Sequence, residues 1–401
     1  MKYLVVLGDG MADVPSVQLG NKTPLEFAKT PNMDNLATMS SIGLVKSVPD
    51  GFKPGSDVAN LSVMGYAPEK FYSGRSPLEA LSIGVELKDG DVAIRTNLVT
   101  LSGDGELATK VMKDYSAGEI STIEAEALIK AVQDALGNDI YHFYSGVSYR
   151  HCLVVSNGTT ATELTPPHDI TDKVVGEYLP RGERGGELLD LIKRSEDVLK
   201  SHPVNLARIE KGKNPATHVW FWGAGTKPKL TSFADMFGLK GAVISAVDLL
   251  KGIAVGAKMD CPQVEGATGT LSTNWEGKIE AVKNSFKNGA DYVYLHMEAP
   301  DECGHQGDMM GKVRAIEYVD YVLGELNAYL KSTNEDYVIA VLPDHATPLT
   351  VKTHTREPIP YMIYKSAKPV VSELKYNEKD AQKGEYLPNG QCIITKMLET
   401  I

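Results

Sequence analysis

The sequence predicts an α/β protein built on a doubly wound, mainly parallel sheet. Two observations carry this prediction. Short apolar runs of buried-strand type alternate with helical patterns along the 401 residues, and polar clusters follow directly after several of the runs. Alternating strands and helices are typical of a largely parallel sheet covered on both faces. The ligand site of such a sheet lies at the carboxyl ends of its strands.

The expected strands are the short apolar runs at 2–7, 91–101, 151–156, 217–222, 241–246, 291–297 and 337–342. Helices are expected between several of them. Thr30-Pro31 predicts one helix start, a capping residue followed by proline at the first helical position. Ser121 and Glu124 form a capping box, which predicts an alanine-rich helix to about Leu136.

Polar residues follow three of these strands, from opposite ends of the chain: Asp9, Asp301 and the adjacent pair Asp344-His345. Because parallel strands end at one edge of a sheet, we expect these side chains to meet there. Residues between about 75 and 225 lack this pattern. The sequence therefore predicts a core formed by residues 1–74 and 226–401, with residues 75–225 as the candidate for an inserted domain.

The composition argues against several kinds of partner. The 41 basic and 52 acidic residues give a formal net charge of −11, which disfavours binding to nucleic acid or anionic lipid. The apolar runs are strand-sized, whereas a membrane span needs about 20 apolar residues, and no signal peptide is expected. The four cysteines are widely spaced without a C-x-x-C pair, which disfavours a disulfide framework and fits a reducing cytoplasm. The oligomeric state is left open.

Metal-binding residue types are densest in HMEAPDECGHQGD, residues 296–308. Asp301 and His305 are four apart, so on a helical turn they share a face and can bind one ion. Taken alone, a D-x-x-x-H pattern is more typical of a solvated helix face. The same is true of the other members: Asp9 between two glycines fits a turn, and Asp344 fits an N-cap.

The position of these residues after predicted strands favours a shared metal centre. With His345 and with His354, nine residues further on, the set holds three carboxylates and three imidazoles. Mixed nitrogen and oxygen ligands suit Mn²⁺ or Zn²⁺, while Mg²⁺ usually prefers oxygen.

Ser56 follows a Pro-Gly turn at the start of an apparent helix in KPGSDVANLSVMGY, residues 53–66. A hydroxyl there meets the positive end of the helix, which favours an incoming phosphate, and a nearby metal would lower the pKa of the hydroxyl. The competing interpretation is that Ser56 only caps the helix. Neither a G-x-S-x-G elbow nor a usual nucleotide-binding loop is present.

Together these residues resemble the alkaline phosphatase superfamily and, more closely, the archaeal-type phosphoglycerate mutases that are independent of 2,3-bisphosphoglycerate. The resemblance runs nearly end to end, through segments that include LGDGMAD, GSDVANLSVMGY, GRSPLEALSIGVEL, DECGHQGD, DHATP and HTREPIP. It implies an alkaline-phosphatase-like α/β core made of both chain ends, with an inserted smaller α/β domain that closes over the substrate. It also implies two divalent metal ions, with Mn²⁺ favoured over Mg²⁺ or Zn²⁺, and no 2,3-bisphosphoglycerate.

The resemblance also implies roles for individual residues. It places Asp9, Ser56, Asp344 and His345 around one metal, and Asp301, His305 and His354 around the other. Ser56 would be the nucleophile that becomes phosphorylated. The implied contacts to the small phosphorylated substrate are basic side chains, namely Arg150, His151, Arg181, Arg184 and Lys251.

The implied reaction interconverts 3-phosphoglycerate and 2-phosphoglycerate, a step of glycolysis and gluconeogenesis. One departure bears on the substrate: family members tend to carry arginines in a D-R-x-A-G-R stretch, and here residues 114–119 read DYSAGE. That loss of positive charge leaves open the homoserine kinase activity proposed for some bacterial members. Two further alternatives are a metal-dependent phosphatase and a non-catalytic metal-binding protein.

Overall fold

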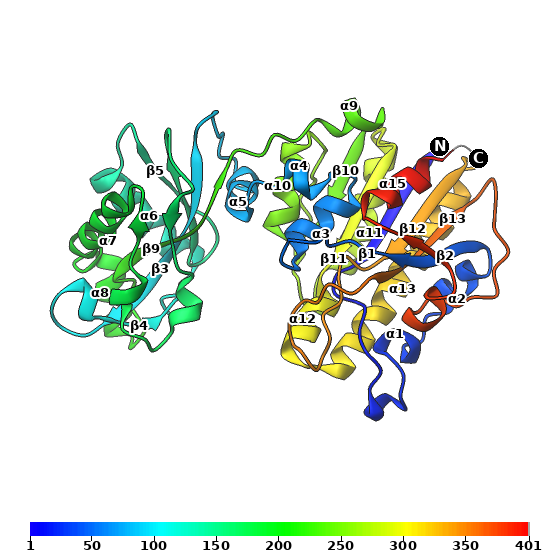
Figure 1. The fold of residues 1–401 in the computed structure, drawn as a ribbon, viewed down its shortest axis with the longest axis horizontal. Helices are drawn as coiled ribbons and strands as arrows, with labels where there is room; N and C mark the ends of the chain where they lie inside the picture. Colours follow the sequence, from blue (N-terminus) through cyan, green and yellow to red (C-terminus); the bar gives the residue numbers. More distant parts are fainter. Residues whose placement is uncertain (400–401) are drawn as a thin grey trace. The chain divides into compact units, whose positions relative to one another are not determined.

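The computed structural model describes residues 1–399, which divide into two compact units. The first consists of residues 1–72 and 229–401, less the two undescribed residues at its end, and the second of residues 73–228. Figure 1 shows the first unit in colours from both ends of the sequence. Each unit has its own sheet and its own apolar core.

The first unit contains a seven-stranded sheet in the order β10-β11-β1-β12-β13-β2-β14. The bounds of these strands, in that order, are Gly241–Ile244, Tyr292–Met297, Lys2–Gly8, Tyr337–Leu342, Ile359–Lys365, Ser40–Val45 and Glu385–Leu387. The first four are mutually parallel, β13 is antiparallel to both of its neighbours, and β14 is parallel to β2. The expected α/β fold with a mainly parallel sheet is thus confirmed.

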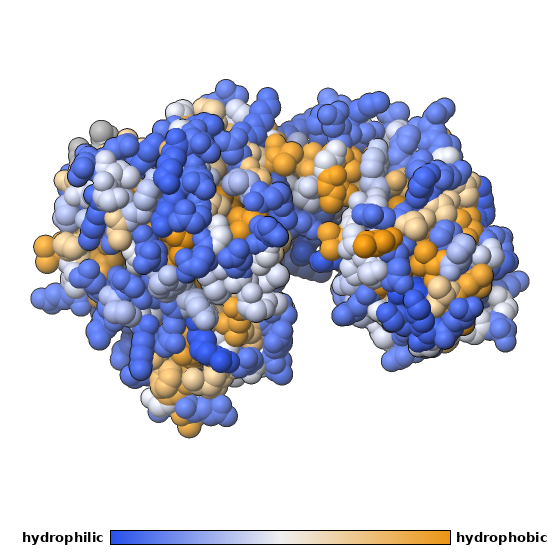
Figure 2. Space-filling view, turned by 180° about the vertical axis from the view of Figure 1, so that it is seen from behind, coloured by the Kyte–Doolittle hydropathy of each residue, from blue (hydrophilic) through white to orange (hydrophobic). Residues whose placement is uncertain are grey.

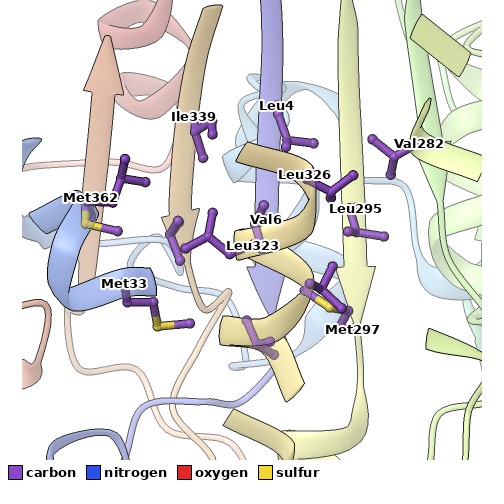
Figure 3. Close-up of a cluster of buried hydrophobic side chains, with 14 of the residues drawn as sticks. Leu4, Val6, Met33, Val282, Leu295, Met297, Leu323, Leu326, Ile339 and Met362 are labelled. Atoms are coloured by element: carbon purple, nitrogen blue, oxygen red, sulfur yellow. The ribbon is translucent and has the colours of Figure 1, made fainter. Parts of the chain in front are cut away.

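Helices cover this sheet. Those of the first unit are α1 (Pro24–Phe27), α2 (Pro31–Ala37), α3 (Ser56–Val63), α4 (Pro68–Phe71), α9 (Phe233–Phe237), α10 (Asp248–Gly256), α11 (Trp275–Lys287), α12 (Ala299–Gln306), α13 (Met309–Ser332), α14 (Glu378–Ala381) and α15 (Gln391–Leu398). Side chains of α2, α11 and α13 share one apolar core with the sheet. Leu4, Val6, Leu295 and Met297 point into this core from adjacent strands (Figure 3).

The second unit has an antiparallel sheet in the order β4-β3-β6-β5, with β9 paired to β3. Its strands are β3 (Val92–Ser102), β4 (Val111–Asp114), β5 (Tyr141–Tyr144), β6 (Arg150–Val155) and β9 (His218–Thr226), with a separate small pair, β7 (Thr162–Glu163) and β8 (Arg181–Gly182). Its helices are α5 (Arg75–Ser82), α6 (Thr122–Leu136), α7 (Gly185–Leu199) and α8 (Pro203–Glu210).

Three expected strands therefore do not join the parallel sheet. The runs predicted at 91–101, 151–156 and 217–222 are β3, β6 and β9, and they pair antiparallel. The neighbouring pair β5 and β6 is antiparallel as well. The loop that joins these two strands is too short for the crossover that parallel pairing requires.

The two predicted helix starts differ in outcome. The capping box at Ser121 and Glu124 is confirmed, because each side chain accepts from the backbone of the other. Helix α2 begins at Pro31 as predicted, but the side chain of Thr30 makes no capping hydrogen bond, so its predicted capping role is wrong.

The core of the first unit yields a stability prediction. Leu326, on α13, is fully buried between the helix and the sheet (Figure 3). We expect Leu326→Ala to lower the free energy of unfolding of this unit by about 2–5 kcal/mol, because it removes buried methyl groups and leaves a cavity. Hydrogen exchange at the amides of β1 and β12 measures that free energy.

A matched control is Val371→Ala in the same unit, since Val371 is 88% exposed. The expected change for this variant is within about 0.5 kcal/mol. An equal effect of both variants would contradict the assignment of Leu326 to the core.

The helices in the described part of the chain include no candidate for a membrane span. Within residues 1–399, none of the helices combines the length and apolar character needed to cross a bilayer. Hydrophilic residues cover most of the face shown in Figure 2, with hydrophobic residues in separate groups.

Candidate active site at the edge of the parallel sheet

Ser56 is the first residue of α3, and Gly55 occupies the capping position without a side-chain hydrogen bond. The interpretation of Ser56 as a mere N-cap is therefore wrong. Its Oγ lies 3.1 Å from Nε2 of His345, on the loop that follows β12. The nucleophile candidate and a metal-ligand candidate are thus in contact, although 289 residues separate them in the sequence.

One group of metal-binding atoms consists of Asp9, Asp344 and His345. Their ligand atoms all lie within 4.8 Å of one another, and all three residues are buried. Nε2 of His345 is 3.6 Å from Oδ1 of Asp9 and 3.3 Å from Oδ2 of Asp344. The carboxyl ends of the adjacent strands β1 and β12 bring these residues together, as the sequence predicts.

A second group consists of Asp301, His345 and His354. His305 adjoins it, because its Nε2 lies 3.2 Å from Oδ2 of Asp301 and 3.0 Å from Nε2 of His354. The rings of His345 and His354 stack with centroids 3.9 Å apart. The structure differs from the predicted grouping in that His345 has ligand atoms close to both sets.

The hydrogen bonds of the imidazoles fit a cation at these positions. Nδ1 of His305 lies 2.9 Å from the carbonyl oxygen of Lys352, which can only accept, so Nδ1 carries the hydrogen. The hydroxyl of Thr347 donates to Asp301 and accepts from Nδ1 of His345. When the rings of His305 and His345 are neutral, the Nε2 atom of each therefore carries a lone pair that faces carboxylate oxygens. Such a donor set suits a divalent metal ion.

The electrostatics of the site reflect its burial. Burial, together with Asp344 and Asp301, raises the pKa of Asp9 well above its usual value. Burial also acts to raise the pKa of Asp301, but hydrogen bonds from His305 and His354 lower it well below its usual value. The same Asp301 bond raises the pKa of His305 to about 9. Positive charge on His305 and the carboxylate of Asp301 thus stabilise each other, whereas burial lowers the pKa of His345.

Gly10 allows the two acidic strand ends to approach each other. It has a φ of +61°, and a Cβ there would lie 2.6 Å from Oδ1 of Asp301 and 2.6 Å from Oγ1 of Thr347. Its backbone N–H donates to Oδ1 of Asp344. The Gly-Asp-Gly turn is therefore part of the site, beyond its role as a turn.

Three side chains at the site were not predicted from the sequence: Asn60, His296 and Thr347. Asn60 lies one turn after Ser56 on α3 and donates both to the carbonyl oxygen of Ser56 and to Oδ2 of Asp344. Its spacing of four from the nucleophile was the available signal. His296 is the last but one residue of a buried strand, and Thr347 follows His345 by two.

The predicted substrate contacts lie in both units. Arg150 and Arg181 are exposed residues of β6 and β8 in the second unit. Arg184 donates to Glu187, the hydroxyl of Tyr141 and the carbonyl oxygen of Asn157. His151 is buried, which lowers its pKa to about 3, and its Nδ1 accepts from the N–H of Gly146. Lys251 lies on α10 in the first unit and pairs with Asp248.

The DYSAGE segment forms a closed loop around Asp114. Its carboxylate accepts from Ser116, Gly118 and Asn214. A buried guanidinium, that of Arg208, donates to the carbonyl oxygen of Ala117 in this loop and to Glu124. Positive charge is therefore present beside the segment, held within the unit by its own contacts.

Comparison with known proteins gives consistent matches. A family model described as "2,3-bisphosphoglycerate-independent phosphoglycerate mutase" matches residues 37–205. A protein of that name from Methanosarcina mazei is 50% identical over 387 residues, 96% of each chain. A "probable" mutase of the same name from Geobacter sulfurreducens is 51% identical over 365 residues, 91% of this chain and 90% of the relative.

Solved structures match over the whole chain. A Pyrococcus horikoshii protein superposes with a TM-score of 0.82 at 29% identity, covering 99% of this chain and 96% of its own. A cofactor-independent phosphoglycerate mutase from Thermoplasma acidophilum gives a TM-score of 0.69 at 25% identity, covering 100% and 99%.

A serine hydroxyl and two groups of metal-binding side chains lie together at the carboxyl ends of a mainly parallel sheet. This arrangement places the protein in the class of metal-dependent α/β enzymes. Within that class, the extent and identity of the matches are decisive. The chain belongs to the 2,3-bisphosphoglycerate-independent phosphoglycerate mutase family. The family resemblance noted in the sequence is confirmed.

Proposed function

We propose that this protein interconverts 3-phosphoglycerate and 2-phosphoglycerate through a phosphoserine at Ser56, without 2,3-bisphosphoglycerate. The observation that carries the proposal is the contact between Ser56 Oγ and Nε2 of His345, a residue near both groups of metal-binding atoms. The names of the relatives give phosphoglycerate as the compound acted on.

In the first half-reaction, Oγ of Ser56 attacks the phosphorus of 3-phosphoglycerate in line. As the bond from phosphorus to the substrate oxygen breaks, Ser56 loses its hydroxyl proton and the departing oxygen gains one, so that it leaves as the 3-hydroxyl. The 2-hydroxyl of the retained glycerate then attacks the phosphoserine and loses its proton, while Oγ of Ser56 leaves phosphorus and regains one. Asn60 holds the first turn of α3 against Asp344, which keeps the attacking oxygen in place.

We propose two divalent metal ions, with Mn²⁺ as the favoured ion and Mg²⁺ or Zn²⁺ as the others to compare. Asp9, Asp344, His345 and Ser56 would hold one, and Asp301, His305 and His354 the other. When bound, these ions would neutralise charge on the phosphoryl oxygens and lower the pKa of the serine hydroxyl. The mixture of carboxylates and imidazoles supports Mn²⁺ over Mg²⁺.

The inserted part of the chain, predicted as residues 75–225, is proposed to close over the substrate. Water must not reach the phosphoserine before glycerate has reoriented, because hydrolysis would turn the mutase into a phosphatase. Arg150, His151, Arg181, Arg184 and Lys251 are the proposed contacts to phosphate and carboxylate. The exposed guanidinium groups of Arg150 and Arg181 suit bidentate binding of these anions.

The alternatives are less well supported. The two relatives described above match at least nine-tenths of this chain, and both are named as phosphoglycerate mutases, one of them as probable. Their names disfavour homoserine kinase and phosphatase activities. A non-catalytic metal-binding protein would have no use for a serine hydroxyl at the first position of a helix beside the ligands.

The test is an assay of purified protein that is stripped of metal and then loaded with Mn²⁺. We expect 3-phosphoglycerate to be converted to 2-phosphoglycerate without added 2,3-bisphosphoglycerate, and we expect chelation with EDTA to lower the rate by about 100-fold or more. Homoserine with phosphoryl donors is assayed in parallel. Conversion of homoserine alone, or release of free phosphate alone, would refute the mutase proposal.

A cytoplasmic location is proposed as well. The four cysteines are free, and two of them, Cys152 and Cys303, are buried. Free thiols persist in a reducing compartment.

A further inference from the structure

Two buried polar side chains of strand β11 contact the site from the face opposite the apolar core. Leu295 and Met297 point into the core of the first unit (Figure 3). Because side chains alternate along a strand, Tyr294 and His296 point to the other face. The hydroxyl of Tyr294 donates to Asn60, and the imidazole of His296 lies against Asp9. One strand thus supports the site from behind at two points.

The ring of His296 is fixed at both nitrogens. Nε2 lies 2.8 Å from Oδ2 of Asp9, and Nδ1 lies 3.2 Å from Oγ of Ser245, just after β10. The carboxylate of Asp9 can only accept, so Nε2 carries the hydrogen that it donates to Oδ2. In the neutral ring, Nδ1 is then the acceptor for the hydroxyl hydrogen of Ser245, whose Oγ also accepts from the N–H of Val247.

The two oxygens of Asp9 consequently have different surroundings. Oδ2 accepts from His296, whereas Oδ1 is buried without a hydrogen-bond partner among the described residues. Oδ1 is also the oxygen that faces Nε2 of His345, at 3.6 Å. A buried carboxylate oxygen without a partner is costly unless a cation binds it.

We propose that His296, held by Ser245, is a positioning residue that orients Asp9 so that Oδ1 is directed to a divalent metal ion. The inference rests on the proposed function, because it takes Asp9 as a ligand of that ion. Three adjacent strands, β10, β11 and β1, supply the chain of contacts from Ser245 through His296 to Asp9. Partners of this kind typically change metal affinity by about 10–100-fold when they are removed.

The experiment is isothermal titration calorimetry of the metal-stripped full chain with Mn²⁺. His296→Ala is expected to weaken the site formed around Asp9 by about 10–100-fold while leaving the site around Asp301 within about threefold of wild type. His296→Gln keeps an N–H donor near the position of Nε2 and is expected to recover most of the affinity. That rescue would not follow if His296 served only to fill space.

A matched control lies on the same strand and face. Tyr292 is fully buried, and its hydroxyl has no hydrogen-bond partner in the described part of the chain. Tyr292→Phe removes a buried polar atom four residues from His296 without touching Asp9, and its Mn²⁺ affinities are expected to equal those of wild type.

Three outcomes would overturn the proposal: equal weakening of both sites in His296→Ala, no weakening, or no rescue in His296→Gln. Should His296→Ala not fold, Ser245→Ala takes its place, since it frees Nδ1 but keeps the imidazole. Unchanged affinity in that variant would overturn the proposal too.

Asp9→Asn separates this inference from the proposed function. If Asp9→Asn loses Mn²⁺ and His296→Ala does not, only the positioning role fails. If wild-type protein binds no Mn²⁺ at all, the proposed function fails with it.

Discussion

Replacing Ser56 with alanine is expected to lower mutase turnover by about 10⁴-fold or more without unfolding the protein. The alanine lacks the oxygen that attacks phosphorus, and the first position of α3 does not require a capping side chain, because Ser56 does not cap the helix. The rate with 3-phosphoglycerate measures the loss, and hydrogen exchange across α3 and β12 verifies the fold.

A second measurement tests the intermediate itself. Brief reaction with phosphate-labelled 3-phosphoglycerate and an acid quench should leave label on the wild-type chain and none on Ser56→Ala. Ser62→Ala is the matched control, since Ser62 lies on the same helix and is fully buried; it should be labelled and active. Retained turnover in Ser56→Ala would eliminate the phosphoserine mechanism.

Loss of His345 is expected to affect both metal sites at once. Its Nε2 lies near Asp9 and Asp344, and its ligand atoms group with those of Asp301 and His354. We expect His345→Ala to lower the affinity for Mn²⁺ at both sites by about 100-fold or more, with loss of turnover, because each site loses a neutral imidazole donor. Calorimetric titration of the metal-stripped protein measures both affinities.

His354→Ala provides the comparison within the site. His354 belongs to the group with Asp301 and not to the group with Asp9, so its loss should weaken one site alone. His142→Ala in the second unit controls for removal of a histidine as such. Equal effects of His345→Ala and His354→Ala would show that the two groups do not share His345.

Much of the site could be predicted because its residues follow strands whose apolar runs are unambiguous. β1, β11 and β12 lie where the sequence predicts them, and Asp9, Asp301 and Asp344 meet because these strands are adjacent and parallel. The start of α3 at Ser56 was predictable from the Pro-Gly turn before it. Local chemistry and one rule about parallel sheets were enough for these residues.

The remainder depends on pairing between distant residues. The sequence did not predict β2 and β13, and it did not show that β3, β6 and β9 pair antiparallel, because strand partners are chosen by the whole sheet. His296 is hidden in a buried strand, where an imidazole looks like any core residue. Only its contact with Asp9 reveals it.

The insertion of the second unit within the first affects the order in which the chain can fold during synthesis. β1 is complete at Gly8, but its neighbour β11 begins at Tyr292 and β12 at Tyr337. At about 5–20 residues per second, the ribosome needs on the order of 15–60 s to supply the first of these neighbours. The strands of the second unit find their partners within residues 73–228, so they emerge well before β1 can be paired. For that interval, the apolar β1 strand, which ends in the Gly-Asp-Gly turn, is exposed in the nascent chain, where chaperones that bind extended hydrophobic segments would find it.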